Sequence, residues 1–267
     1  MDTPVDARTE SAPRLVESPV FVISTVRSGS TLLRCVLDTH SQVYAGHEMH
    51  LGGFRVAVET PPAVAAADEM GLSATELEHM LWDRMLHHQL QASGKSILVE
   101  KTPGNAGMWR RISACWPHAK YIFLLRHPLH VLDSLAEIFR GQLADRALPY
   151  SAQEVEEKIR TSALEQISPM IGAVAEARAH LDGITVRYED LTNSPESVTK
   201  ALCEYLGIPW EAAMLEYGSH DHGPFRMFLG DWHEKISSGV IQPHRRLPSP
   251  DEVPEDLADH CRALGYM

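Results

Sequence analysis

A small polar loop between two apolar segments is the first part of this sequence that could do chemistry. Residues 18–33 read SPVFVISTVRSGSTLL, which predicts a buried strand, a turn and a helix. Gly29 allows a tight turn, and the backbone N–H groups of Ser28–Thr31 would then point out of the helix N-terminus. This geometry binds phosphate-like anions. A plain turn with an exposed Arg27 has the same pattern, so the loop alone leaves both interpretations open.

The position and type of the cationic residue distinguish this loop from the phosphate-binding loop of nucleotide triphosphatases. That loop reads GxxxxGK[ST], with the lysine on the terminal phosphates and the hydroxyl on magnesium. Here no lysine precedes the Ser30-Thr31 pair, and Arg27 stands before Gly29 instead. The loop is therefore predicted to hold a tetrahedral anion rather than a magnesium triphosphate.

A second group of polar residues follows two other predicted strands. FLLRHPLHVLDS places Arg126 at the end of a strand and Ser134 about two turns into the next helix. The planar guanidinium of arginine donates bidentately to phosphate. VRYEDL places Tyr188 at the end of another strand, where tyrosine is also common as plain packing.

A third group could move a proton. In GHEMHLGGF, Glu48 and His50 flank one residue and His47 precedes them, and in VEKTP Lys101 follows an apolar run. A carboxylate or an imidazole can take a hydroxyl proton, and cations can stabilise developing negative charge. A solvated loop acid is the alternative interpretation of Glu48.

The elements that must position these residues alternate between strands and helices. Short apolar runs predict strands at residues 19–24, 96–100, 120–126 and 183–188. Helical spacing and capping signals predict helices at residues 30–40, 73–93, 128–140, 151–180 and 195–206, and a short one from about 254. The alternation indicates an α/β fold, a central parallel sheet with helices on both faces, whose ligands bind beyond the carboxyl ends of the strands.

Composition sets the class of protein. The 267 residues are 44% hydrophobic and 22% charged, as expected of a globular domain at 18–267, and we expect residues 1–17 to be a disordered arm. A formal net charge of −12 argues against non-specific binding to nucleic acid or to anionic membranes. Four distant cysteines, no signal-peptide pattern and no membrane-length apolar run predict a cytoplasmic protein.

These motifs resemble those of sulfotransferases that use 3′-phosphoadenosine 5′-phosphosulfate (PAPS), in motif order from about residue 20 to residue 239. The resemblance implies a P-loop NTPase-like sulfotransferase fold in which STVRSGSTLL holds the 5′-phosphate and the sulfonate. It implies that Arg27 touches the transferring group and that Arg126 and Ser134 bind the 3′-phosphate. Tyr188 would lie near the adenine.

The third group is similar to segments of carbohydrate sulfotransferases, in which the glutamate of Glu-x-His is the general base. The resemblance implies Glu48 as the base, with Arg27 and Lys101 stabilising an in-line transition state. His50 would orient Glu48 or act as the base itself, and His47 is a third candidate.

The C-terminal segment FLGDWHEKISSGVIQP is similar to the family's loop that closes over the nucleotide, with Gly230, Lys235 and Gly239 as the positions of interest. The basic cluster that many members place before it is absent, and Arg226 is the nearest substitute. The residues expected to bind the cofactor are Arg27, Ser28, Gly29, Ser30, Thr31, Arg126, Ser134, Tyr188, Lys235 and Gly239.

The expected cofactor is PAPS, with adenosine 3′,5′-bisphosphate as its product and no metal required. Metal binding at His220 and His222, near Asp221, is not expected, because further ligands at a defined spacing are lacking. The resemblance implies that the acceptor is a hydroxyl of a small molecule, a glycan or a carrier-tethered chain. An acyl carrier protein is the expected candidate partner, and secondary metabolism is the expected setting. The alternatives are a nucleotide-dependent phosphotransferase and a non-catalytic nucleotide-binding protein, and the oligomeric state stays open.

Overall fold

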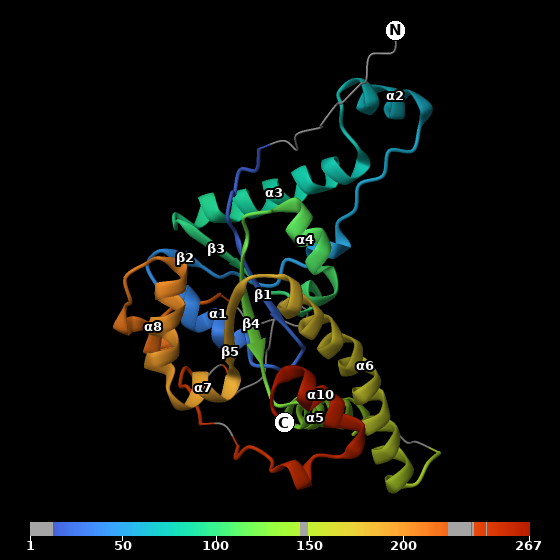
Figure 1. Ribbon diagram of the computed structural model, residues 1–267, viewed down its shortest axis with the longest axis vertical. Coiled ribbons are helices and arrows are strands. Elements are labelled where there is room, and N and C mark those ends of the chain that lie inside the picture. Colours follow the sequence, from blue (N-terminus) through green and yellow to red (C-terminus); the bar gives the residue numbers. More distant parts are fainter. Residues whose placement is uncertain (1–12, 145–148, 224–235, 237, 244) are drawn as a thin grey trace.

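A five-stranded parallel sheet forms the centre of the molecule. The computed structural model describes residues 13–144, 149–223, 236, 238–243 and 245–267 (Figure 1). The strand order is β2-β3-β1-β4-β5, with every neighbouring pair parallel. The strands are β1 (Val20–Ser24), β2 (Val43–Tyr44), β3 (Ile97–Glu100), β4 (Lys120–Leu125) and β5 (Gly183–Arg187).

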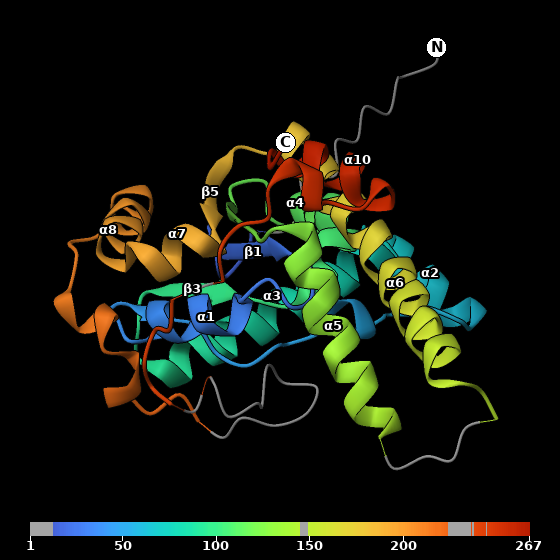
Figure 2. The same cartoon turned by 90° about the horizontal axis from the view of Figure 1, so that it is seen from below.

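Helices cover both faces of the sheet (Figure 2). They are α1 (Ser30–Asp38), α2 (Pro61–Glu69), α3 (Ala74–Ser93), α4 (Trp109–Cys115), α5 (Pro128–Leu143), α6 (Ala152–His180), α7 (Tyr188–Asn193), α8 (Pro195–Leu206) and α10 (Glu255–Leu264). Phe21 and Ile23 of β1 join a core with α3, α4, α5 and α6, whereas Val20 and Val22 join a core with α1 and α8. The alternation of side chains along β1 thus supplies both cores, and the predicted α/β fold is confirmed.

The register of the sheet brings the strand ends to one edge. Phe21 of β1 pairs with Glu100 of β3 on one side and with Tyr121 of β4 on the other. Leu125, the last residue of β4, pairs with Arg187, the last residue of β5. Because all strands run in the same direction, the residues that follow each strand meet at the carboxyl edge.

Several elements, among them β2, α2 and α7, escaped prediction, and the start of the ordered chain moves. Tyr188, predicted as the last residue of a strand, is the first residue of α7. The strand β2 has two residues, too few for a periodic pattern, and α2 lies in a segment that we did not assign. Within the expected arm, the guanidinium of Arg14 donates to Glu76 at 2.8 and 2.9 Å and Val16 is buried in the core, so the packed domain includes Arg14 and Val16. Residues 1–12 lie outside the described ranges.

Within the described ranges, neither the 29-residue α6 nor any other helix combines the length and apolarity needed to cross a membrane.

Candidate active site

The loop after β1 is held in an unusual backbone conformation. Gly29, the N-cap of α1, has φ 88°. Among the described residues other than glycine, only Arg27 (φ 60°) and His50 (φ 48°) have a left-handed backbone, and both were predicted site residues. Such residues cost free energy and cluster at functional sites. The Ser28 hydroxyl donates to the carbonyl of Thr25 at 2.7 Å, which closes the turn.

Five predicted residues from four elements converge at this loop. Arg27 Nε donates to Ser134 Oγ of α5 at 3.1 Å, and Arg126 donates to the carbonyl oxygen of Arg27 at 2.8 Å. The guanidinium of Arg126 stacks on the Tyr188 ring, 4.5 Å from its centroid. A Cβ on Gly29 would lie 2.2 Å from the same ring, so only glycine allows the loop to approach Tyr188. The structure thus brings the two predicted anion sites side by side.

The Arg126 guanidinium is partly buried and only partly hydrogen-bonded. Burial lowers the pKa of Arg126, while the nearby Tyr188 and Glu189 oppose that shift. Its Nε is buried and has no hydrogen-bond partner among the described residues. A buried unpartnered donor is costly, because water no longer solvates it. The donor set of this pocket, guanidinium groups and hydroxyls beside an aromatic ring, fits a phosphorylated nucleoside.

A second cluster lies beyond the end of β3. The ammonium of Lys101, fully buried, donates to Glu48 Oε1 at 2.5 Å, and His50 Nε2 lies 3.5 Å from Glu48 Oε2. Burial lowers the pKa of Lys101, and the Glu48 carboxylate opposes that shift in part. One carboxylate therefore contacts both the predicted cation and the predicted second base.

Glu100, the last residue of β3, supports this second cluster and was not predicted as a site residue. Its carboxylate accepts from the Thr102 hydroxyl at 2.5 Å, from the Met49 N–H at 3.1 Å and from Asn105 Nδ2. The Thr102 oxygen also accepts from the N–H of His50 at 3.2 Å. A buried glutamate that ends an apolar strand was the signal in the sequence, because such a carboxylate needs several donors.

The remaining predicted residues lie in α1, in the loops near Gly218 and Gly223, or outside the described residues. Ser30 and Thr31 are buried in the first turn of α1. His47 lies against Gly223, where an added Cβ would be 3.0 Å from its Nε2, and Gly239 lies against Gly218. Gly230, Lys235 and Arg226 lie outside the described residues. The role of the C-terminal segment in nucleotide binding therefore stays a prediction.

Two solved structures resemble this fold along nearly the whole chain. The sulfotransferase domain of the Synechococcus PCC 7002 olefin synthase has a TM-score of 0.65 and 20% identity, and the match covers 96% of this chain and 98% of that domain. The sulfotransferase domain from the curacin biosynthetic pathway has a TM-score of 0.56 and 24% identity, with 94% and 98% covered. At these identities the likeness shows the fold.

Sequence comparison finds curated relatives of greater length. The nodulation protein NoeE of Sinorhizobium fredii is 26% identical over 206 residues, 70% of this chain and 49% of that protein. Protein-tyrosine sulfotransferase 1 of Danio rerio is 25% identical over 210 residues, 74% of this chain and 55% of that protein. An uncharacterised Aquifex aeolicus protein is 27% identical, with 26% of its length covered. The chain therefore spans a quarter to about half of these relatives.

A family model decides the assignment that the site geometry suggests. The model described as the Sulfotransferase family matches residues 19–212, which is well over half of the chain. The chain belongs to the sulfotransferase family.

Proposed function

We propose that this protein transfers the sulfuryl group of PAPS to an acceptor hydroxyl. The observation that carries the proposal is the convergence of Arg27, Arg126, Ser134 and Tyr188 on the anion-binding turn. A nucleotide with phosphates on two ribose oxygens needs two anion-binding groups, and these residues supply two guanidiniums beside an aromatic ring. Family membership supports the reaction class.

PAPS, when bound, supplies an activated sulfuryl group whose leaving group is the 5′-phosphate of adenosine 3′,5′-bisphosphate. In the proposal, Arg126 and Ser134 hold the 3′-phosphate and Tyr188 packs against the base. The N–H groups at the start of α1 and Arg27 hold the 5′-phosphate and the sulfonate. No metal is required, because guanidinium and ammonium groups can neutralise the charge that develops on these oxygens.

Glu48 is the proposed general base. Its Oε2 faces His50 at 3.5 Å, and its Oε1 accepts from Lys101. The carboxylate takes the proton of the acceptor hydroxyl while that oxygen bonds to sulfur and the S–O bond to the 5′-phosphate breaks. Lys101 stays charged and stabilises the sulfonate oxygens. His50 orients Glu48, and it is the proposed base if Glu48 is not.

The acceptor is proposed to enter beside His50. A cavity of about 200 Å³ lies there, and it is lined by His50, Leu51, Gly52, Gly53, Thr102, Gly104, Asn105 and Met108. The similar fold of sulfotransferase domains from an olefin synthase and from the curacin pathway favours a carrier-tethered hydroxyl, with an acyl carrier protein as partner, over a free small molecule or glycan.

Calorimetry with the product nucleotide tests the donor part of the proposal. We expect adenosine 3′,5′-bisphosphate to bind without any metal, and ATP or GTP with Mg²⁺ to bind at least about tenfold more weakly, which is 1.4 kcal/mol. Preferential binding of ATP with Mg²⁺ would instead favour a phosphotransferase.

Turnover of labelled PAPS tests the base. With an acceptor found by screening, Glu48→Gln should lower kcat by about 100-fold or more and leave bisphosphate affinity unchanged, because proton transfer contributes that much. Glu69→Gln, on the exposed end of α2, is the matched control. If Glu48→Gln keeps normal turnover and His50→Gln loses it, the base is His50. Bisphosphate binding without turnover of any acceptor would leave a nucleotide-binding protein.

A further inference from the structure

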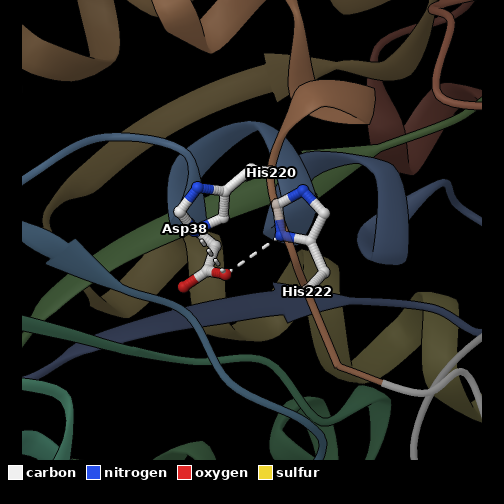
Figure 3. Close-up of side chains that lie close together, drawn as sticks. All are labelled: Asp38, His220 and His222. Carbon is white, nitrogen blue, oxygen red and sulfur yellow. Dashed lines mark hydrogen bonds and ion pairs between the residues drawn. The ribbon is translucent and has the colours of Figure 1, made fainter.

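Two histidines and an aspartate that the proposed reaction does not use meet at the C-terminal end of α1. Asp38 is the last residue of α1, and His220 and His222 follow a short 3₁₀ helix (Tyr217–Ser219). Figure 3 shows the Asp38 carboxylate facing both imidazole rings. Asp38 Oδ2 lies 3.0 Å from His222 Nδ1 and 3.9 Å from His220 Nε2. One donor atom from each side chain lies within 4.8 Å of the other two.

The contacts of the His222 ring require a proton or a metal ion between His222 Nδ1 and Asp38 Oδ2. His222 Nε2 lies 2.8 Å from the carbonyl oxygen of Tyr217, and because a carbonyl only accepts, Nε2 carries a proton. In neutral imidazole the other nitrogen, Nδ1, then presents a lone pair to Asp38 Oδ2, which also only accepts. Two lone pairs at 3.0 Å repel each other unless a proton or a metal ion lies between them.

The remaining contacts of Asp38 leave that one oxygen for a cation. Oδ1 accepts from the N–H of Ala45 at 3.0 Å and lies 3.5 Å from Lys95 Nζ. The carboxylate is therefore oriented by Oδ1, and Oδ2 faces the two rings. Histidine ligands are commonly fixed in the same way, by donating their second N–H to a backbone carbonyl, as His222 does to Tyr217.

A metal ion accounts for His220 as well as for His222. A proton between His222 and Asp38 makes no use of His220, whose Nε2 nevertheless approaches the same oxygen. Zinc bonds of about 2.1 Å in tetrahedral geometry place donor atoms about 3.4 Å apart. The observed separations from Asp38 Oδ2, 3.0 and 3.9 Å, lie on either side of that value. The positive charge of Lys95 disfavours a bound cation, but Lys95 Nζ lies beside Asp38 Oδ1 and not beside Oδ2.

We propose that Asp38, His220 and His222 bind a divalent transition-metal ion, for which Zn²⁺ is the probe. Two imidazoles and a carboxylate are donors that zinc takes. The sequence offers Asp221 as the carboxylate, but Asp221 accepts from the N–H of Gly223 at 2.8 Å, and the fold supplies Asp38 instead. The ion would tie the C-terminal end of α1 to the segment 217–223. The ion would lie about 13 Å along α1 from the anion-binding turn, and it takes no part in the proposed sulfuryl transfer.

Zinc titration of the full chain, stripped of metal by a chelator, tests the site. We expect wild type to bind one equivalent and His220→Ala to bind about 100-fold more weakly. The His220 side chain is 40% exposed, so its removal should leave the fold intact. His88→Ala, an exposed histidine of α3 outside the cluster, is the matched control and should bind as wild type does. Absence of zinc binding by wild type, or equal binding by His220→Ala, overturns the proposal.

Imidazole nitrogen NMR gives a second measurement that needs no variant. On addition of zinc, His222 should show one protonated and one metal-bound nitrogen. If both nitrogens of His222 stay protonated in excess zinc, the cation is a proton, the contact is an imidazolium–carboxylate pair, and the metal site is refuted.

Discussion

Lys101 has the surroundings that most affect the chemistry of this site. Its side chain has no exposed surface, and a buried ammonium has lost its hydration. The Glu48 carboxylate at 2.5 Å compensates in part, yet burial still lowers the Lys101 pKa. A cation held in such a water-poor place acts strongly on negative charge that develops nearby. The same lowered pKa gives the site a pH limit.

The activity should fall with rising pH before ordinary lysines titrate. A lysine is charged below its pKa, so a pKa below 10.5 moves the loss of charge to lower pH. We expect the alkaline limb of kcat/KM for sulfuryl transfer to lie below pH 10.5. In Lys101→Arg, any residual activity should lack this limb, because guanidinium stays charged. A wild-type profile that is flat to pH 10.5 would show that Lys101 does not carry the limit.

Gly29→Ala should weaken nucleotide binding more than it weakens the fold. An alanine there has to accept φ 88° and has to displace the Tyr188 ring, which lies 2.2 Å from the new Cβ. Gly71→Ala is a matched control, because Gly71 has φ 68° and open space around its Cβ position. Both changes should cost about 1 kcal/mol of backbone strain. Only Gly29→Ala should lower bisphosphate affinity, by about tenfold or more, since Arg126 stacks on the displaced ring. Equal affinities of the two variants would contradict the close approach.

The end of β3 and the loop that carries Glu48 form one hydrogen-bonded unit. Glu100 Oε1 accepts from Met49 and from Thr102, and Oε2 accepts from Asn105. Met49 lies between Glu48 and His50, so the strand end fixes the backbone that carries both. Glu100 touches neither residue's side chain in these contacts and is a positioning residue.

Glu100→Gln alone should disrupt this hydrogen-bonded unit, and a second change that exchanges donor and acceptor at Asn105 should restore it. Glu100→Gln puts an amide N–H₂ against the Asn105 amide, and we expect kcat to fall about tenfold while KM for PAPS stays unchanged. The double variant Glu100→Gln with Asn105→Asp reverses the hydrogen bond and keeps one buried carboxylate, so it should recover most of kcat. Failure of the double variant to recover, with a wild-type melting temperature, would argue against positioning through Glu100.

Local signals in the sequence predicted the elements that carry the site. Helical periodicity and the Ser73 cap predicted α3, and the cap is observed, because Ser73 Oγ accepts from the N–H of Glu76 at 3.0 Å. The Glu76 carboxylate binds Arg14, 62 positions away. A helical pattern gives no information about so distant a partner.

The sequence predicted which residues of the candidate site lie at one edge of the sheet, but it did not predict their contacts. The strand ends placed Arg27, Arg126 and Tyr188 at one edge, because parallel topology follows from alternating elements. Their contact with one another depends on the register of β4 and β5, which the sequence does not give. The meeting of Asp38 with His222 likewise depends on a chain path 184 positions long.

The molecule as a whole is acidic, yet the proposed nucleotide pocket is cationic. The net charge of −12 repels a polyanion at long range, so affinity has to come from the guanidiniums at the sheet edge. These groups follow different strands: Arg27 follows β1, and Arg126 follows β4 and stacks on Tyr188 after β5. A ligand that contacts all three would hold neighbouring strand ends together. Its binding should therefore oppose unfolding of the whole sheet.

Thermal denaturation should report this linkage. At about 100 times its Kd, a ligand that binds only the native state adds about 2.7 kcal/mol, which for a chain of this size raises Tm by roughly 5 °C. We expect adenosine 3′,5′-bisphosphate to produce that shift in wild type. Arg126→Met should lose most of the shift at the same concentration, because its pocket then lacks one guanidinium. ATP with Mg²⁺ at the same concentration should give a much smaller shift, since it has no 3′-phosphate. Equal shifts from the two nucleotides in wild type would mean that Arg126 does not recognise a 3′-phosphate.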